Sequence, residues 1–129
     1  MSQFHAVVWM DHAEAHVLEF AGKVTERKRV RNAHAEHLHH KAGVIGAGKG
    51  GLDAGYCKEV VEAVSGAGEI LLVGPGNAKL EFIRYLHKHA PQVEAKIVGV
   101  ETADHPTDGQ LLAHARARFE AIDRMRPQL

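Results

Sequence analysis

The chain has 129 residues, 45% hydrophobic and 25% charged, which is an ordinary composition for one globular domain spanning 1–129. Its 16 basic and 16 acidic side chains cancel, which argues against a strong grip on nucleic acid through net charge but leaves local basic patches open. One cysteine excludes an internal disulfide, and no apolar run approaches the roughly 20 residues of a membrane helix, so we expect a cytoplasmic protein with no membrane partner.

The first 31 residues contain three short segments rich in β-branched and aromatic side chains, which predict strands. These segments span 4–10, 15–20 and 23–31. Ala21 and Gly22 form a tight turn between the last two. The third segment is the most polar of the three, because it carries Arg27, Arg29 and Arg31, and this predicts an edge strand.

Helical and apolar patterns alternate in the rest of the chain. They predict, in order, a helix over 54–66 capped by Asp53, a strand over 69–74, a helix from the Asn77 cap to Pro91, a strand over 95–101 and a last helix that opens on a capping box of Thr107 and Gln110. The spacing of apolar residues predicts three core-facing stripes: Tyr56, Cys57, Val60, Val61 and Val64; Leu80, Ile83 and Leu86; and Leu112, Ala115, Phe119 and Ile122.

The predicted element order is β-β-β-α-β-α-β-α. Three meandering strands followed by two strands reached through helices predict an α/β fold with a five-stranded mixed sheet and three helices, in a ribonuclease H-like arrangement. The unbroken apolar character of 70–74 and 95–100 predicts that these two strands are parallel and either central or adjoining.

The glycine run "AGVIGAGKGGLD" (42–53) shares features with two nucleotide-binding patterns. A P-loop needs a strand before its glycines and a hydroxyl residue after its lysine, whereas a His-rich stretch precedes this run and Gly50 follows Lys49. A dinucleotide fingerprint needs the same preceding strand. Neither pattern has its context, so we expect no P-loop type of nucleotide binding and interpret the irregular segment 32–52 as a partner-facing surface.

Three stretches together resemble a known family: "GKGGLD" (48–53), "ILLVGPGNAKLEF" (70–82) and "VETADHPTDGQLLAHA" (100–115). They are similar to the middle domain of the archaeal and eukaryotic class 1 peptide-chain release factors and of Pelota, over roughly residues 39–115. Small bacterial proteins like this one are grouped with the same superfamily of translational machinery components. The resemblance implies a ribonuclease H-like fold and the ribosome or tRNA as partner.

The resemblance breaks down at one position of the glycine loop. The family's loop reads Gly-Gly-Gln, and its glutamine helps position water for attack on peptidyl-tRNA, whereas this chain has Gly50, Gly51 and Leu52. Leucine has no hydrogen-bonding group in its side chain. We therefore expect a ribosome- or tRNA-binding protein that does not hydrolyse peptidyl-tRNA. Glycines that permit close backbone approach and nearby lysines predict the contact residues for RNA or another partner: Lys41, Gly48, Lys49, Gly50, Gly51 and Lys79.

The chain contains 11 histidines, and four of them form the cluster "HAEHLHH" at His34, His37, His39 and His40. Neutral imidazoles bind zinc or nickel, so this cluster is a candidate site for a divalent metal. The alternative interpretation is a solvated loop whose charge varies near neutral pH. A metal-binding or structural domain that forms a homo-oligomer is accordingly one alternative function.

A second alternative is a metal-dependent nuclease or phosphodiesterase. Asp11 follows the first predicted strand, and Glu101 and Asp104 follow the last, so the three carboxylates are candidates for a two-metal site at one end of the sheet. Carboxylates at strand ends also commonly serve turns, which is the competing interpretation.

Overall fold

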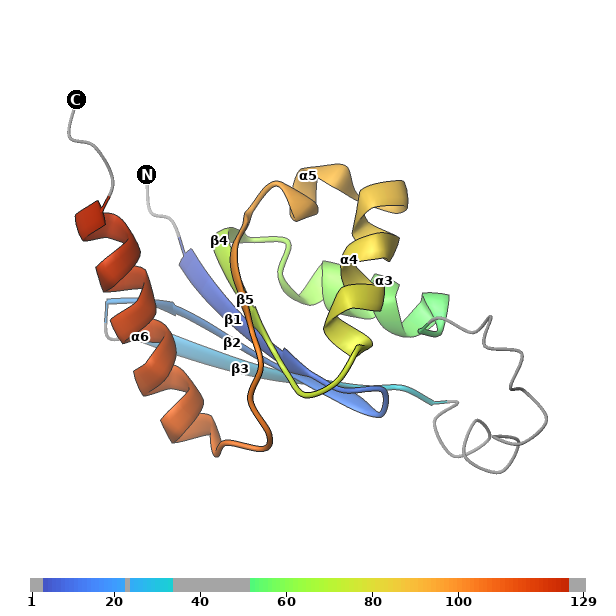
Figure 1. The fold of residues 1–129 in the computed structure, drawn as a ribbon, viewed down its shortest axis with the longest axis horizontal. Coiled ribbons are helices and arrows are strands. Elements are labelled where there is room, and N and C mark those ends of the chain that lie inside the picture. Colours follow the sequence, from blue (N-terminus) through green and yellow to red (C-terminus); the bar gives the residue numbers. More distant parts are fainter. Residues whose placement is uncertain (1–3, 23, 34–51, 126–129) are drawn as a thin grey trace.

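The computed structural model describes residues 4–22, 24–33 and 52–125. Their core is a five-stranded mixed sheet in the order β3-β2-β1-β4-β5, with helices on both faces (Figure 1). In chain order the elements are β1 (Phe4–Met10), β2 (Glu14–Ala21), β3 (Val24–Arg31), α3 (Ala54–Ala63), β4 (Ala67–Val73), α4 (Ala78–His89), α5 (Pro91–Glu94), β5 (Ile97–Glu101) and α6 (Asp108–Met125).

The strand pairing confirms the predicted α/β class and mixed sheet. β1, β2 and β3 form an antiparallel meander, while β4 pairs parallel to both β1 and β5. The adjoining parallel pair and the edge position of β3 are therefore confirmed. The described residues include four helices rather than the expected three, because Pro91 opens the additional short helix α5 instead of merely ending α4.

Helices cover the two faces of the sheet unequally (Figure 1). The first face, which we call the three-helix face, packs against α3, α4 and α5. Its buried core includes Ala6, Val8, Met10, Val17, Ile70 and Leu72 from the strands and Tyr56, Cys57, Val60, Phe82 and Leu86 from the helices. The second, the α6 face, packs against α6 alone, through Val7, Trp9, Leu18, Phe20, Leu71, Val73, Leu111, Ala115 and Phe119.

Two of the three predicted helix caps are formed as expected. Asp53 accepts a hydrogen bond from the backbone of Tyr56 at 3.0 Å. Thr107 and Gln110 form the reciprocal capping box, with hydrogen bonds of 2.9 and 3.1 Å. Asn77 lies at the N-cap of α4, but its side chain makes no capping hydrogen bond.

The predicted core stripe of α4 is wrong at one position. Leu80 is 49% exposed, whereas Lys79 is 6% exposed and Phe82 and Leu86 are buried. Ile83 and Leu86 pack in the core as predicted, whereas Lys79 is buried in place of Leu80 because backbone carbonyls of the turn before the helix hold its ammonium group inside. In the last helix Ala115 and Phe119 are buried as predicted and Leu112 packs partly buried against the core, while Leu111 is a further buried residue that the predicted stripe did not include. Among the described residues, no helix has the length and apolar character needed to cross a membrane.

Candidate functional site

The parallel strands β1, β4 and β5 end at the same edge of the sheet, which is where open α/β sheets usually bind ligands. The turn Gly74-Pro75-Gly76 after β4 is packed tightly against this edge. A Cβ atom on Gly74 would lie 2.2 Å from the Met10 carbonyl oxygen, so no larger residue fits there. Gly76 has a φ of +62°, a conformation that favours glycine. Gly74 is therefore explained by close backbone packing, and Gly76 by its backbone conformation.

The Lys79 ammonium group completes this turn. Its Nζ donates hydrogen bonds of 2.8 Å to the carbonyl oxygens of Gly74 and Gly76. The sequence predicts a partner contact for Lys79, and that role stays a prediction. In the structure the buried ammonium stabilises the turn, so it would have to exchange these carbonyls for a ligand.

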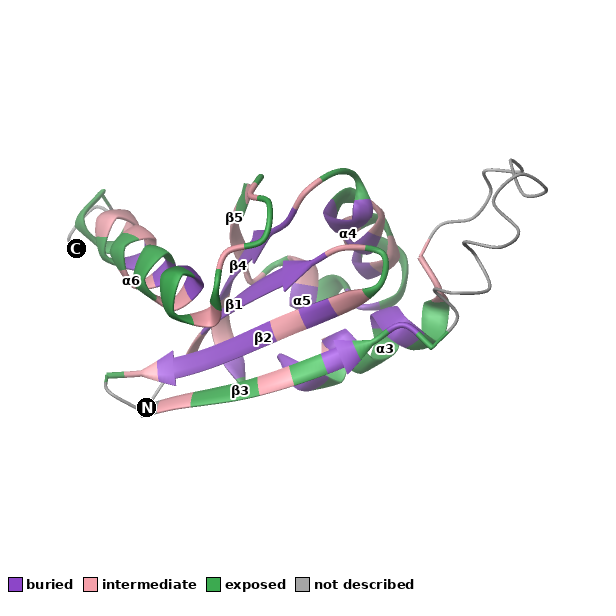
Figure 2. Cartoon of the chain, turned by 90° about the horizontal axis from the view of Figure 1, so that it is seen from below, coloured by how far each residue is buried: buried purple, intermediate pink, exposed green. Residues whose placement is uncertain are grey.

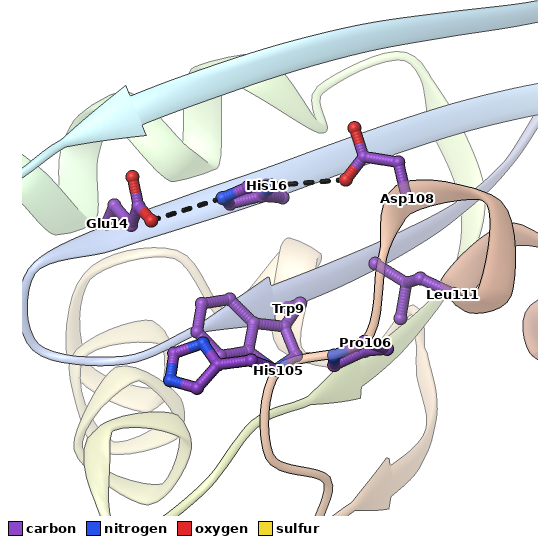
Figure 3. Close-up of a pocket in the computed structure, with 7 residues that line it drawn as sticks. All are labelled: Trp9, Glu14, His16, His105, Pro106, Asp108 and Leu111. Carbon is purple, nitrogen blue, oxygen red and sulfur yellow. Dashed lines mark hydrogen bonds and ion pairs between the residues drawn. The ribbon is translucent and has the colours of Figure 1, made fainter.

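A pocket of about 220 Å³ lies beside this edge on the α6 face (Figure 3). Its walls come from β1, β2 and the start of α6, and consist of Trp9, Glu14, His16, His105, Pro106, Asp108 and Leu111. The Trp9 indole Nε1 donates a 2.6 Å hydrogen bond to the Asp104 carbonyl oxygen, which fixes the segment before α6 against β1. The ring of His105 packs 4.7 Å from the indole.

His16 is held between two carboxylates in this pocket (Figure 3). Its Nε2 lies 3.3 Å from a Glu14 oxygen, and its Nδ1 lies 3.2 Å from a carboxylate oxygen of Asp108. These contacts join β2 to the first residue of α6. No local sequence pattern singles out Trp9, His16 or Asp108, because their proximity depends on the pairing of Trp9 with His16 in β1 and β2 and on the position of α6.

A second polar cluster forms where β5 meets α6. Both carboxylate oxygens of Glu101 accept hydrogen bonds, one from His114 and the other from Arg118. Burial alone would raise the pKa of Glu101, but the hydrogen bonds and positive charges of these two partners lower it below its ordinary value. This carboxylate therefore stays ionised and anchors α6 to the edge strand.

The three carboxylates of the nuclease alternative have separate roles in the structure. The Asp11 side chain accepts hydrogen bonds from the backbone of Ala13 and Glu14 at 2.8 and 2.9 Å, which is the turn role weighed above. Glu101 binds α6, and Asp104 contributes its carbonyl oxygen to Trp9. Within the ranges that the structure describes, no three His, Cys, Asp or Glu side chains are grouped so that they could hold a metal ion. In the described ranges, Asp11, Glu101 and Asp104 are therefore not brought together as a three-carboxylate cluster.

Most of the predicted contact and metal residues lie outside the described part of the chain. These are Lys41, Gly48, Lys49, Gly50 and Gly51, together with His34, His37, His39 and His40. Leu52 is the first described residue after this segment, and it directly precedes Asp53, the N-cap of α3. Leu52 is partly buried and packs against the core of the three-helix face.

Two titratable groups on α3 are buried in the same core. Burial, with a smaller contribution from the nearby Asp11 carboxylate, raises the pKa of the Tyr56 hydroxyl, which donates a 2.9 Å hydrogen bond to the Asp11 carbonyl. Burial also raises the pKa of the Cys57 thiol to about 12, with the Asp53 carboxylate adding to the effect. Both groups are therefore neutral at physiological pH and belong to the core.

No protein-family model and no curated protein sequence matches the chain. Solved structures do. Pelota from Thermoplasma acidophilum aligns with a TM-score of 0.60 and 19% identity, over 89% of this chain and 32% of Pelota. Pelota from Archaeoglobus fulgidus aligns with a TM-score of 0.62 and 14% identity, over 97% of this chain and 38% of the Pelota chain. The archaeal translation termination factor aRF1 aligns with a TM-score of 0.58 and 12% identity, over 95% of this chain and 39% of aRF1.

These alignments confirm, at the level of the fold, the resemblance inferred from the sequence. The chain spans between about a third and two fifths of the length of these structural neighbours. One of these neighbours, aRF1, is a translation termination factor. The likeness extends over nearly all of this chain, including the N-terminal strands that lay outside the sequence resemblance.

Proposed function

We propose that this chain is a cytoplasmic, translation-associated protein that binds the ribosome or tRNA. The observation that carries the proposal is the alignment of nearly the whole chain with archaeal Pelota and with the termination factor aRF1. The sheet order β3-β2-β1-β4-β5 also supports the finer assignment of a ribonuclease H-like fold, which the resemblance implies for this domain. The glycine loop with Lys41 and Lys49 is the proposed contact surface.

The same proposal includes a lack of peptidyl-tRNA hydrolysis. Leu52 occupies the position of the family's glutamine, and it is partly buried against the core next to the cap of α3. A residue that positions water needs a polar group within about 3 Å of the reacting atoms. Leu52 supplies none, and the Asp53 carboxylate beside it caps the helix. Binding without chemistry is the function that fits these contacts.

Co-sedimentation of the untagged protein with purified ribosomes tests the binding proposal. We expect the wild type to sediment with ribosomes and the double variant Lys41→Ala/Lys49→Ala to do so less. The matched control, Lys58→Ala/Lys88→Ala, removes the same charge from exposed positions of α3 and α4 and should behave like the wild type. Absence of the wild type from the ribosomal pellet at low salt would contradict the proposal.

A single-turnover assay on ribosome-bound peptidyl-tRNA tests the chemistry. We expect no release above background by the wild type. Release by the wild type that Gly51→Ala abolishes would show that another residue has replaced the glutamine. The variant Leu52→Gln, once its thermal unfolding shows an intact fold, tests whether restoring the glutamine side chain is sufficient for peptide release.

A further inference from the structure

Three arginines of β3 form a row on one face of the sheet. Arg27, Arg29 and Arg31 alternate along the strand, and they pair across to Leu18, His16 and Glu14 of β2, which belong to the α6 face. All three arginines are exposed. Figure 2 shows β3 along the outer edge of the sheet, exposed or half-exposed over most of its length.

Lys28, which lies between Arg27 and Arg29, is a cation of this strand whose partners are within the protein. Lys28 points to the three-helix face, where its Nζ donates a 3.0 Å hydrogen bond to the Ala63 carbonyl and lies 3.1 Å from the buried Glu19 carboxylate. The side chains of Arg27, Arg29 and Arg31, by contrast, make no hydrogen bond or ion pair with any residue in the described ranges. Their positive charge is therefore available to a ligand.

A groove of about 270 Å³ lies between two arginines of this row, Arg27 and Arg29, and the start of α6. It is lined by His16, Arg27, Lys28, Arg29 and Asp108. The negative groups nearest to it are Asp108 and Glu14, and each of them lies against His16, at 3.2 and 3.3 Å. Both carboxylates thus contact His16, although Glu14 also lies opposite Arg31 in the strand pairing and Asp108 shares the groove with Arg27 and Arg29. The three arginines outnumber these two carboxylates and are exposed on the β3 side.

We propose that Arg27, Arg29 and Arg31 form a binding surface for the phosphate backbone of single-stranded RNA. Alternate residues of a strand are about 6.5 Å apart, so the row offers three positive charges in line along an extended chain. Guanidinium groups bind phosphate oxygens through paired N–H donors. Because the chain has no net charge, this row is a local concentration of positive charge rather than part of a generally basic surface.

This inference deepens the proposed function and rests on it for the choice of RNA as ligand. The test is fluorescence anisotropy with a labelled single-stranded RNA oligonucleotide of mixed sequence, over a series of salt concentrations. The variant is Arg27→Gln/Arg29→Gln/Arg31→Gln. The control, Lys58→Gln/Arg84→Gln/Lys88→Gln, removes three charges from exposed positions of α3 and α4. Thermal unfolding of both variants confirms that each is folded.

We expect the arginine variant to bind RNA at least about tenfold more weakly at low salt, while the control stays within about twofold of the wild type. The slope of log affinity against log salt should fall by about 2, since each phosphate contact on a single strand contributes about 0.7. Equal loss in both variants would overturn the proposal, because only net charge would then matter. Displacement of the RNA by poly-L-glutamate at equal charge concentration would overturn the choice of RNA.

Ribosome co-sedimentation of the same variants separates this inference from the proposed function. If the wild type and the arginine variant sediment equally well and bind RNA equally well, the row is not the contact surface although ribosome binding stands. If the wild type fails to sediment but binds RNA through the arginines, the row stands and the ribosomal setting is wrong.

Discussion

Helices cover the two faces of the sheet to different extents. On the three-helix face, α3, α4 and α5 cover the strands from β4 to β3, and even Lys28 at the edge finds a buried partner in Glu19. On the α6 face, a single helix covers the centre of the sheet and leaves the β3 arginines in solvent. The difference indicates that the first face serves stability, while the second combines a smaller core with a surface open to ligands.

The comparison is sharpest for large core side chains. Phe82 on the three-helix face and Phe119 on the α6 face are 1% and 3% exposed. Phe82→Ala should lower the free energy of unfolding by about 4–5 kcal/mol, because a cavity enclosed by helices and sheet cannot collapse. Phe119→Ala should cost about 3 kcal/mol, because Phe119 borders an open groove with Phe20 and Arg116 that can admit water. Urea titration measures both; an equal loss would show that the two cores are equivalent.

Neighbouring residues of β3 extend the comparison to charged side chains. Lys28→Met should lower the free energy of unfolding by about 1–3 kcal/mol, because the Glu19 carboxylate, 7% exposed, loses its ion pair. Arg29→Met, one residue further along the strand, should change it by no more than about 0.5 kcal/mol. Both can be read from denaturant midpoints. A loss for Arg29→Met as large as that for Lys28→Met would mean that the row is structural.

The smallest expected effect is a pH dependence at the edge of the α6 face. Because the folded-state pKa of Glu101 is lowered from the ordinary value of 4.5, its ionised form contributes stability above that value, and the contribution is lost as the pH falls through the folded pKa. Glu101→Gln should therefore be less stable than the wild type at neutral pH by less than about 1 kcal/mol, and the difference should shrink as the pH falls below the ordinary value of 4.5 and through the lowered folded-state pKa.

The control for this measurement is Glu120→Gln, which removes a carboxylate that is 72% exposed on α6, the helix that Glu101 contacts. We expect no comparable convergence with acidification for this variant. A constant difference between wild type and Glu101→Gln across the acid range would show that the contacts with His114 and Arg118 do not depend on the charge of Glu101.

Local patterns were sufficient for much of the fold. The Asp53 cap, the Thr107–Gln110 capping box and the parallel pairing of β4 with β5 could be predicted, since each depends on residues close in sequence or on the apolar character of one segment. The burial of Lys79 in place of Leu80 could not, because a lysine in a helical pattern is normally taken as exposed. Lys79 is buried by carbonyls of a turn whose shape no local pattern specifies.

The candidate site was harder to predict for a related reason. His16 and Asp108 are 92 residues apart, and their contact requires the β1–β2 register and the docking of α6 together. The motif that carries the family resemblance, Gly74-Pro75-Gly76 with Lys79, consists of residues that the turn itself requires. The resemblance therefore indicated the fold reliably, and the surfaces for ligands had to be found from the arrangement of the strands.

The buried Cys57 has a practical consequence for labelling the protein. It is the single cysteine of the chain, and with a pKa of about 12 its thiol carries almost no thiolate at the pH of maleimide chemistry. A cysteine introduced at an exposed position of β3, for example by Arg29→Cys, would then be the one fast-reacting thiol of the folded protein. A fluorophore or photo-crosslinker can therefore be attached to β3 without first replacing Cys57.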